Sequence, residues 1–334
     1  MPDSHFGHNS ATPCVTIGMP VYNGGKFIDA AIQSILAQTH QNFTLVIADN
    51  ASTDETQTIC RRYARLDKRI HYIRNETNIG ASLNCNKLFK LCSTEYFKLC
   101  AHDDILLPTY LESCVSVLEK DPSVALCHSR TKYIDFAGRD IPYSDNEHAF
   151  VDQSSGYSWR FDPEGRQLDS RSPTKRFDDF IRKTITTLEV WGVIRNTLLQ
   201  KVRPFSPYFG SDRVTLADLI LLGRFVEIDD VLFLKRCHEE QVTIQPVADR
   251  AAACGAENPK TVRFSGALCF LDYLSVIKHC SLRFWQKAAC LLSLGRLVVR
   301  KETMFKLFVP GAYNYFGIDF DLSFLKSFGP GSIE

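Results

Sequence analysis

Five short apolar runs decide the fold of this chain: VTIGMPV at residues 15–21, FTLVIAD at 43–49, IHYIR at 70–74, YFKLCA at 96–101 and VALCHS at 124–129. Each run has the length of a strand and is rich in branched or aromatic residues. Segments with helical periodicity lie between the runs. Strands that alternate with helices imply right-handed crossovers and a mainly parallel α/β sheet, whose ligands bind at the carboxyl ends of the strands.

Four helices are predicted between those strands. The first covers residues 26–38, where apolar residues recur on one face. The second begins at Ser52, whose spacing to Glu55 fits a capping box. The third covers residues 81–92, and the fourth begins at Pro108, a residue suited to the first helical position.

The second half of the chain is less regular. Gly, Pro, Ser, Asp and Arg accumulate between Phe136 and Arg182, which predicts a long loop or insertion that acts as a lid. Regular structure is predicted to resume in four segments: a helix over 188–202, a helix over 212–222, a strand pair at 225–228 and 231–236 joined by Asp229 and Asp230, and a helical tail from about Ala248.

Composition excludes several classes of protein. Lys and Arg number 39 against 38 Asp and Glu, so no overall field would draw the chain to nucleic acid. The apolar segments 267–277 and 288–299 are too short to span a bilayer, although contact with a membrane surface stays open. The 12 cysteines form no C-x-x-C pair, and residues 1–13 lack the pattern of a secretory signal. These features predict a reduced, cytoplasmic protein without a transmembrane segment.

Adjacent acids follow the fourth apolar run. YFKLCAHDDILLP, at 96–108, delivers His102, Asp103 and Asp104 to the carboxyl end of a strand. Neighbouring carboxylates repel each other, and this cost is offset when a divalent cation sits between them and a diphosphate. Their hard oxygen atoms favour Mg²⁺ or Mn²⁺. The structural alternative is a helix N-cap with a neighbouring acid.

Four blocks in a fixed order resemble glycosyltransferase family 2 over about residues 15–130: VTIGMPVYNGG at 15–25, VIADNASTDET at 46–56, NETNIGASLNCN at 75–86 and AHDD at 101–104. The resemblance implies a GT-A fold and transfer of a sugar from a nucleotide diphosphate to an acceptor. The implied donor-contacting residues are Pro20, Val21, Tyr22, Asn23, Asp49, Asn50, Asn78, Gly80, Asn86, His102, Asp103, Arg236 and His238. The implied metal ligands are Asp104, placed first, and Asp103.

Asn50 departs from the family pattern, in which the second residue of this pair is usually an acid that reads the base. Because an amide both donates and accepts hydrogen bonds, UDP, dTDP and GDP donors all remain open. The turn at Tyr22 is expected to lie against base and ribose, with an ordinary strand-to-helix turn as the alternative.

A catalytic base is expected in FGSDRVTLADLILLGRF, at 209–225, which resembles the later acidic motif of the family. The resemblance implies that Asp212 removes the proton of the acceptor hydroxyl, with Ser211 and Arg213 beside the acceptor. Trp191 is a candidate platform for a sugar ring. A helix N-cap and a core tryptophan are the structural alternatives.

Lys235, Arg236 and His238, in VLFLKRCHEEQVT at 231–243, are expected to neutralise the leaving diphosphate together with the metal. A solvated strand end is the alternative. Opposed base and leaving group imply single displacement with inversion. Two other functions stay open, a sugar-phosphate nucleotidyltransferase and a non-catalytic nucleotide-binding module. A nucleotidyltransferase normally needs a Gly-rich basic loop to bind a triphosphate, and after the first strand this chain has only Gly24, Gly25 and Lys26 for it.

Four regions are predicted: a flexible N-terminus over 1–13, a nucleotide-sugar half over 14–135, an acceptor-side half over 136–245 and a helical extension over 246–334. The expected partners are the donor and a hydroxyl-bearing acceptor, either a glycan, a lipid-linked sugar or a small molecule. A homodimer through the C-terminal helices is a further hypothesis.

Overall fold

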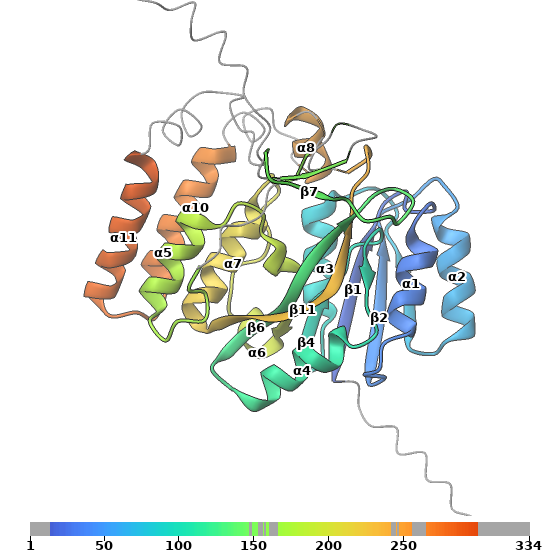
Figure 1. Cartoon of the computed structure of the whole chain (residues 1–334), viewed down its shortest axis with the longest axis horizontal. Helices are drawn as coiled ribbons and strands as arrows, with labels where there is room; N and C mark the ends of the chain where they lie inside the picture. The colour runs from blue at the N-terminus through green and yellow to red at the C-terminus, as the bar shows by residue number, and fades with distance from the viewer. Residues whose placement is uncertain are drawn as a thin grey trace, which may run out of the picture.

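The computed structural model describes residues 14–299, apart from 147–148, 153–155, 157, 160–165, 242–244, 246 and 256–264. Within these residues the chain forms a large twisted sheet with helices on both faces and further helices at one side (Figure 1). The predicted flexible N-terminus over 1–13 and the end of the predicted helical extension lie outside the described residues.

Eight strands form the large sheet, in the order β3-β2-β1-β4-β10-β6-β11-β5. Their bounds are β1 Val15–Val21, β2 Phe43–Asp49, β3 Ile70–Arg74, β4 Tyr96–Leu99, β5 Ile105–Leu106, β6 Val124–Ile134, β10 Val193–Arg195 and β11 Arg224–Arg236. β1 pairs in parallel with β2 and β4, β2 with β3, and β6 with β11, whereas β10 and β5 pair antiparallel. The predicted mainly parallel α/β sheet is therefore confirmed, and all five predicted runs form strands.

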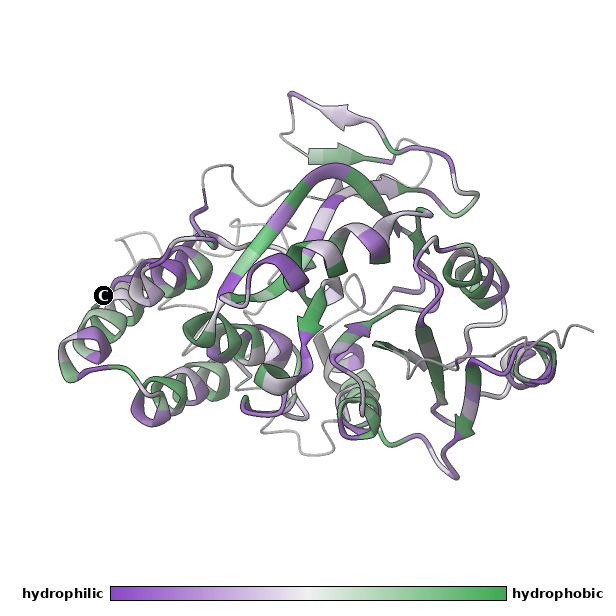
Figure 2. Cartoon of the chain, turned by 90° about the horizontal axis from the view of Figure 1, so that it is seen from below, coloured by the Kyte–Doolittle hydropathy of each residue, from purple (hydrophilic) through white to green (hydrophobic). Residues whose placement is uncertain are grey.

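Helices cover both faces of this sheet. Their bounds are α1 Ile28–Leu36, α2 Thr56–Leu66, α3 Ala81–Leu91, α4 Tyr110–Lys120, α5 Pro173–Lys183, α6 Asn196–Leu199, α7 Ser211–Leu222, α8 Val247–Ala253, α10 Ser265–His279 and α11 Phe284–Val299. α1, α2 and α4 pack on one face, and α3, α5, α7, α10 and α11 contribute to the core on the other. Because both faces are covered there, β1, β2 and β4 are mostly buried and apolar, whereas the long strands β6 and β11 also carry polar residues. Figure 2 shows both green and purple along the strands and the helices.

The start of α2 differs from the prediction. Ser52 does not cap the helix, because its hydroxyl accepts the Asn23 backbone N–H at 2.9 Å and its own N–H donates to Asp49 Oδ1 at 2.8 Å. The helix begins at Thr56, whose N–H donates to Asp54 Oδ1 at 3.0 Å. The serine instead ties two loops together at the carboxyl edge of the sheet.

The predicted helix over 188–202 is wrong. A 3₁₀ helix, η1 (Leu188–Trp191), is followed by strand β10 and the short helix α6. A side chain at Gly192 would meet the Cys127 carbonyl oxygen at 2.9 Å, so the chain passes close to β6 there. Val193 and Ile194 are β-branched and fill the gap between β4 and β6, and this tertiary pairing overrides the helical pattern.

The predicted strand pair joined by Asp229 and Asp230 is also wrong. Residues 224–236 form one long strand, β11, parallel to β6. The two acids sit at a register shift, because Ile228 pairs with Ser129 and Val231 already pairs with Arg130. They bulge outward instead of turning the chain.

The stretch 136–182 holds more regular structure than a loop. Three strands, β7 Tyr143–Ser144, β8 Ala149–Val151 and β9 Ser158–Trp159, form a small separate sheet. Helix α5 follows, and Ser172 caps it by accepting the Lys175 N–H, with Pro173 at the first helical position. Whether the segment acts as a lid stays a prediction.

All 12 cysteines lie in the described part of the chain and are free, most of them buried. None of the helices in the described residues has the length and apolar character needed to cross a bilayer.

Candidate active site

The carboxyl end of β4 brings the acid pair against the end of β11. Strand β5 follows Asp104 directly and pairs antiparallel with β11, so that Ile105 lies opposite Leu234. This pairing carries Asp104 to the neighbourhood of Lys235 and Arg236, which are more than 130 positions away in sequence. The sheet thereby joins two motifs that the sequence places in separate halves.

Asp104 is fully buried and interacts through both carboxylate oxygens. Oδ1 accepts the backbone N–H of Arg236 at 2.9 Å, and Oδ2 lies 3.4 Å from Nζ of Lys235. Burial raises the pKa of Asp104 to about 6, while Lys235 lowers it and the neighbouring Asp103 raises it further. Lys235 also lies 5.3 Å from the centre of the Trp191 ring, so this cation bridges the acid and the indole.

Asp103 has a different environment although it is the preceding residue. Its Oδ2 lies 3.0 Å from Nε2 of His238. Burial opposes ionisation, but the His238 hydrogen bond and the nearby His102 and Lys235 charges hold the pKa of Asp103 well below its usual range. Asp103 is therefore an ionised carboxylate beside an imidazole.

Arg236 is committed to the frame of the site. Its guanidinium donates to the backbone carbonyls of Asp103 at 2.9 Å, Asp135 at 3.2 Å and Phe136 at 2.9 Å. These bonds hold the acid pair and the end of β6 in place. The contact of Arg236 with a diphosphate stays a prediction, and Lys235 and His238 are the basic side chains that face the two carboxylates.

The residues at this edge fit a divalent cation. Asp103 and Asp104 supply hard oxygen atoms, and an ion held by one or two carboxylates with substrate phosphates is the usual arrangement for Mg²⁺. Nδ1 of His238 is buried without a hydrogen-bond partner among the described residues. Since Nε2 of the same ring meets Asp103, Nδ1 suits a phosphate oxygen better than the ion that the two carboxylates would hold.

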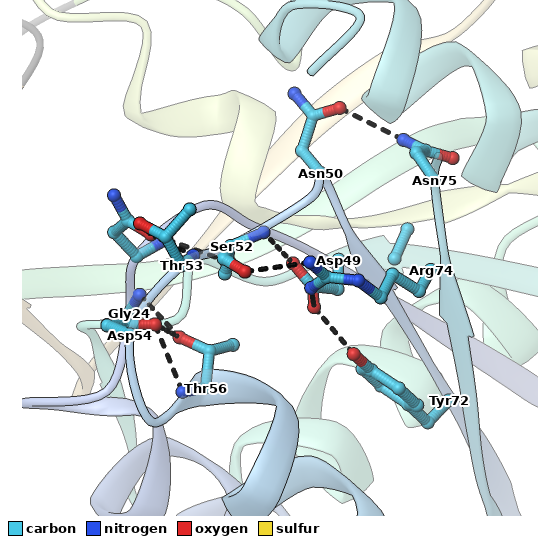
Figure 3. Close-up of polar contacts among 12 residues, drawn as sticks. Gly24, Asp49, Asn50, Ser52, Thr53, Asp54, Thr56, Tyr72, Arg74 and Asn75 are labelled. Atoms are coloured by element: carbon cyan, nitrogen blue, oxygen red, sulfur yellow. Dashed lines mark hydrogen bonds and ion pairs between the residues drawn. The ribbon is translucent and has the colours of Figure 1, made fainter. Parts of the chain in front are cut away.

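The carboxylate of Asp49 accepts several hydrogen bonds at the end of β2 (Figure 3). Asp49 is fully buried and accepts from the Ser52 N–H at 2.8 Å, the Tyr72 hydroxyl at 2.5 Å and the Arg74 guanidinium at 2.6 Å. Burial opposes ionisation, but these hydrogen bonds together lower the pKa of Asp49. Asp49 fixes the loop that follows β2, and its direct contact with a nucleotide stays a prediction.

Asn50 is oriented by a network of amides. Its Oδ1 accepts from Asn75 Nδ2 and from the Ile79 N–H, both at 3.0 Å, and its Nδ2 donates to Asn78 Oδ1 at 2.6 Å. The backbone donor at Ile79 fixes which side of the amide is oxygen. One N–H of Asn50 has no hydrogen-bond partner in the described part of the chain, in a residue that is 3% exposed.

The turn after β1 presents Tyr22 to solvent, with 47% of its surface exposed. Asn23 has a positive φ of 51° and accepts the Thr53 N–H at 2.8 Å. The Gly24 N–H donates to the Thr56 hydroxyl at 2.8 Å (Figure 3). Pro20 and Val21 precede the turn on β1, so the first and second predicted blocks meet at one edge.

The third block is tied to the C-terminal half. Gly80 has a φ of 82°, and a side chain there would meet the Gly255 Cα at 2.4 Å, so the segment after α8 packs on this turn. The Asn86 side chain exchanges two hydrogen bonds with the backbone of Phe205, at 2.7 and 2.9 Å. Asn86 thus has a structural partner, and its donor contact stays untested.

Asp212 is the second residue of α7 and accepts a hydrogen bond from the Thr187 hydroxyl at 3.0 Å. Burial raises the pKa of Asp212 above its ordinary value, and the Thr187 bond opposes the rise. Such a carboxylate is suited to accepting a proton near neutral pH.

The other predicted acceptor residues have structural contacts. The Ser211 hydroxyl donates to the Ser206 carbonyl at 2.8 Å. Arg213 is buried and donates to the carbonyls of Phe180 at 3.4 Å and Ile181 at 3.0 Å. Contact of Ser211 and Arg213 with an acceptor stays a prediction.

The 3₁₀ helix η1 connects the two acidic centres. Thr187, just before η1, binds Asp212, and Trp191, its last residue, packs on Lys235, the partner of Asp104. Glu189, between them, is buried and paired with Arg166 at 2.5 Å. The predicted sugar platform Trp191 therefore lies beside the acid pair.

Two residues of this region were missed in the sequence. Lys98 of β4 is fully buried, its ammonium lies 4.3 Å from the centre of the Tyr110 ring, and it donates to the Trp191 carbonyl. Its position inside an otherwise apolar predicted strand was the sequence feature that could have indicated it. Thr187 gave no signal, because nothing in its local sequence connects it with Asp212.

Comparisons with known proteins identify the family. The family model described as Glycosyl transferase family 2 matches residues 16–182. An uncharacterized glycosyltransferase of Rickettsia prowazekii is 36% identical over 112 residues, which are 34% of each chain. The match thus spans about a third of the length of that curated relative.

Solved structures agree in fold at low sequence identity. S. aureus TarS 1–349 in complex with UDP has a TM-score of 0.58 and 18% identity, covering 88% of this chain and 75% of that one. The mannosyltransferase PcManGT from Pyrobaculum calidifontis, in complex with GDP-Man and Mn²⁺, has a TM-score of 0.50 and 16% identity, covering 88% and 82%. The chain therefore belongs to glycosyltransferase family 2 and has the GT-A fold.

Proposed function

We propose that the protein transfers a single sugar from a nucleotide diphosphate to an acceptor hydroxyl, with inversion at the anomeric carbon. The observation that carries the proposal is the buried pair Asp103 and Asp104 held against Lys235 and His238 at the carboxyl edge of the sheet. This edge is where ligands bind in open α/β folds. The related structures solved with UDP and with GDP-Man and Mn²⁺ support a donor of this class.

Donor binding is assigned to the first three blocks. Tyr22 is exposed and offers a ring on which a base stacks. The unused N–H of Asn50 donates to a base carbonyl, a group present on uracil, thymine and guanine, so the nucleotide remains open among the three. Asp103 and Asp104 would hold a Mg²⁺ or Mn²⁺ ion, which would supply positive charge to the leaving diphosphate.

The transfer step is assigned to Asp212. Its carboxylate takes the proton of the acceptor hydroxyl as the oxygen attacks the anomeric carbon, and the bond from that carbon to the diphosphate oxygen breaks. Lys235 and His238 stabilise the negative charge that the diphosphate gains. A single base opposite the leaving group predicts inversion. An NMR assignment that finds the same anomer in donor and product would refute this mechanism.

Thermal-shift measurements with UDP, dTDP and GDP, each with and without MnCl₂, test the donor site. A ligand raises the melting temperature in proportion to its binding free energy. We expect the combined shift of one nucleotide with Mn²⁺ to exceed the sum of the separate shifts. Asp104→Asn should remove this excess, whereas Asp229→Asn, at an exposed acid paired with Arg130, should keep it. An unchanged excess in Asp104→Asn would refute the metal assignment.

A further inference from the structure

The outward face of α11 is apolar. Phe284 is 79% exposed, Trp285 52%, Leu291 46% and Leu292 65%. Their spacing, with exposed Ala288 between them, places them on one side of the helix. The opposite side carries Cys290 and Leu294, which are buried in the core that includes α5. In Figure 1, α11 is the outermost helix at the left of the molecule, so this face forms part of its outer surface.

Among the described residues from Lys278 to Val299, the charged side chains near this face are all basic. The sequence contains no carboxylate between Asp272 and Glu302, whereas Lys278, Arg283, Lys287 and Arg296 lie in that stretch. Lys278, Arg283 and Arg296 are exposed. An apolar face bordered only by cations is complementary to an anionic partner.

The nearest carboxylates are neutralised inside the protein. Asp272 of α10 pairs with Arg203 and accepts the Tyr208 hydroxyl, both at 2.5 Å. On α5, Asp178 pairs with Arg182 at 2.7 Å, and Asp179 pairs with Lys175 at 3.0 Å and with Lys183 at 3.2 Å. They therefore do not compensate the positive charge of α11.

The turn between α10 and α11 is held in shape. Lys287 Nζ donates to the Lys278 carbonyl at 2.7 Å, which closes the turn. The Arg283 guanidinium lies 5.1 Å from the centre of the Trp285 ring, and the Phe284 and Trp285 rings meet edge to face at 5.3 Å. We call Arg283, Phe284, Trp285 and Lys287 the aromatic tip. It presents two large rings to solvent beside two cations.

We propose that the aromatic tip and the outward face of α11 dock on the surface of a bilayer that contains anionic lipids. A helix with Trp, Phe and Leu on one face and Lys and Arg at its borders lies in the headgroup region, with its rings at the boundary to the acyl chains. The phosphate-bearing headgroups supply the negative charge that the border lacks. A protein partner is less favoured, because the face is convex and carries no carboxylate or hydrogen-bonding pattern that would select one sequence.

Vesicle flotation of the full-length protein tests the proposal. We expect binding to phosphatidylcholine vesicles that contain about 30% phosphatidylglycerol, about tenfold weaker binding to pure phosphatidylcholine, and release in high salt. The double variant Phe284→Ser, Trp285→Ser should bind at least about tenfold more weakly, because two rings are lost from the boundary. Leu66→Ser is the matched control, since Leu66 is 75% exposed on α2, which is a separate helix. Equal binding to both vesicle types, or equal loss in Leu66→Ser, would overturn the proposal.

Two further measurements separate the other occupants of this face. The fluorescence of Trp285 is obtained as the difference between the spectra of wild type and Trp285→Phe. In the free protein it should have the emission wavelength of an indole in water, and it should shift to shorter wavelength when anionic vesicles are added. If it is already blue-shifted in the free monomer, residues 300–334 or another part of the chain cover the tip, and the proposal fails. Light scattering tests for a dimer. If the wild type is a dimer, the double variant is a monomer and neither binds vesicles, the face belongs to a second copy of the chain and the proposal is overturned.

Discussion

The acid pair at the end of β4 and Asp212 at the start of α7 are both buried carboxylate centres, but their surroundings differ. Lys235 and the Arg236 backbone contact Asp104, and His238 contacts Asp103. The His238 hydrogen bond with the His102 and Lys235 charges keeps Asp103 ionised, whereas burial raises the pKa of Asp104 to about 6. Asp212 has the Thr187 hydroxyl as its side-chain partner, and burial raises its pKa. The first centre thus keeps one ionised carboxylate, Asp103, beside Asp104, whose pKa is raised like that of Asp212. Asp212 differs in having no lysine or histidine among its side-chain partners in the described part of the chain, and a carboxylate of raised pKa is suited to accepting a proton.

The N-terminus of α7 does not cancel the rise in the pKa of Asp212. The positive end of α7 favours an anion at Asp212 by about 0.3–1 kcal/mol, which corresponds to less than about one pKa unit. The pKa of Asp212 is nevertheless raised, so loss of solvent outweighs the dipole.

Asp212→Asn should lower kcat by about 10²- to 10⁴-fold, because the amide has the shape of the acid but cannot take a proton. The KM for the donor should change little, since the base faces the acceptor. Steady-state kinetics with a saturating acceptor measure both. Asp229→Asn, at a 94% exposed side chain, is the control. A loss smaller than about tenfold would remove Asp212 as the base.

Asp104→Asn should lower kcat/KM by about 10²- to 10³-fold, because charge stabilisation at the diphosphate is lost. The remaining rate should no longer depend on Mn²⁺. A titration of Mn²⁺ in wild type and variant measures this difference. A variant that keeps the wild-type metal dependence would show that Asp104 does not serve the ion, and Asp103→Asn would then be the next variant to test.

Thr187→Val should move the acidic limb of the pH–rate profile to higher pH by up to about one unit. The Thr187 bond favours the ionised form of Asp212, so its removal raises the pKa of the base further. The rate should fall up to about tenfold below the limb and stay unchanged well above it. Thr44→Val, which removes a hydroxyl bonded to the Arg69 carbonyl, is the matched control. A uniform loss at all pH values would indicate a structural role instead.

Tyr72→Phe extends the comparison to Asp49, a fully buried carboxylate that accepts three hydrogen bonds. We expect about 1–2 kcal/mol less stability near pH 7, because a bond to a charged group is lost. The folded pKa of Asp49 is depressed, so this stabilisation is present above the ordinary Asp value of about 3.9 and is lost as the pH falls through the folded pKa.

Urea unfolding at several pH values should therefore show the two proteins converging in acid. Tyr22→Phe, at an exposed ring, should change stability by less than about 0.5 kcal/mol at any pH. A difference between wild type and Tyr72→Phe that persists in acid would mean that the bond to Asp49 is not its source.

Local sequence patterns were sufficient to predict most strands and helices of the N-terminal half. The five apolar runs form strands, and the helices predicted after the first, third and fourth strands are present. Each of those runs is covered on both faces, so hydrophobicity, spacing and chain order agree. The start of α2 was misjudged, because the Ser52 hydroxyl bonds across a loop to Asn23 and not within its own helix.

Local patterns failed where distant segments decide the structure. Residues 193–195 form a strand because they pair with both β4 and β6. Asp229 and Asp230 form a bulge and not a turn because the residues on both sides of them pair with the same strand, β6. Helix α5 had readable signals in Ser172 and Pro173, which the polar composition of the surrounding stretch concealed.

The sequence by itself determined the alternating α/β order, the acids at the strand end and the family, since these depend on short-range pattern and motif order. Only the tertiary structure decided that Lys235 and His238 face Asp104 and Asp103, that Thr187 holds Asp212, and that Asn50 has one free donor. The physical reason is that a carboxylate's protonation depends on solvent exclusion and on charges within a few ångströms, and chain folding sets both.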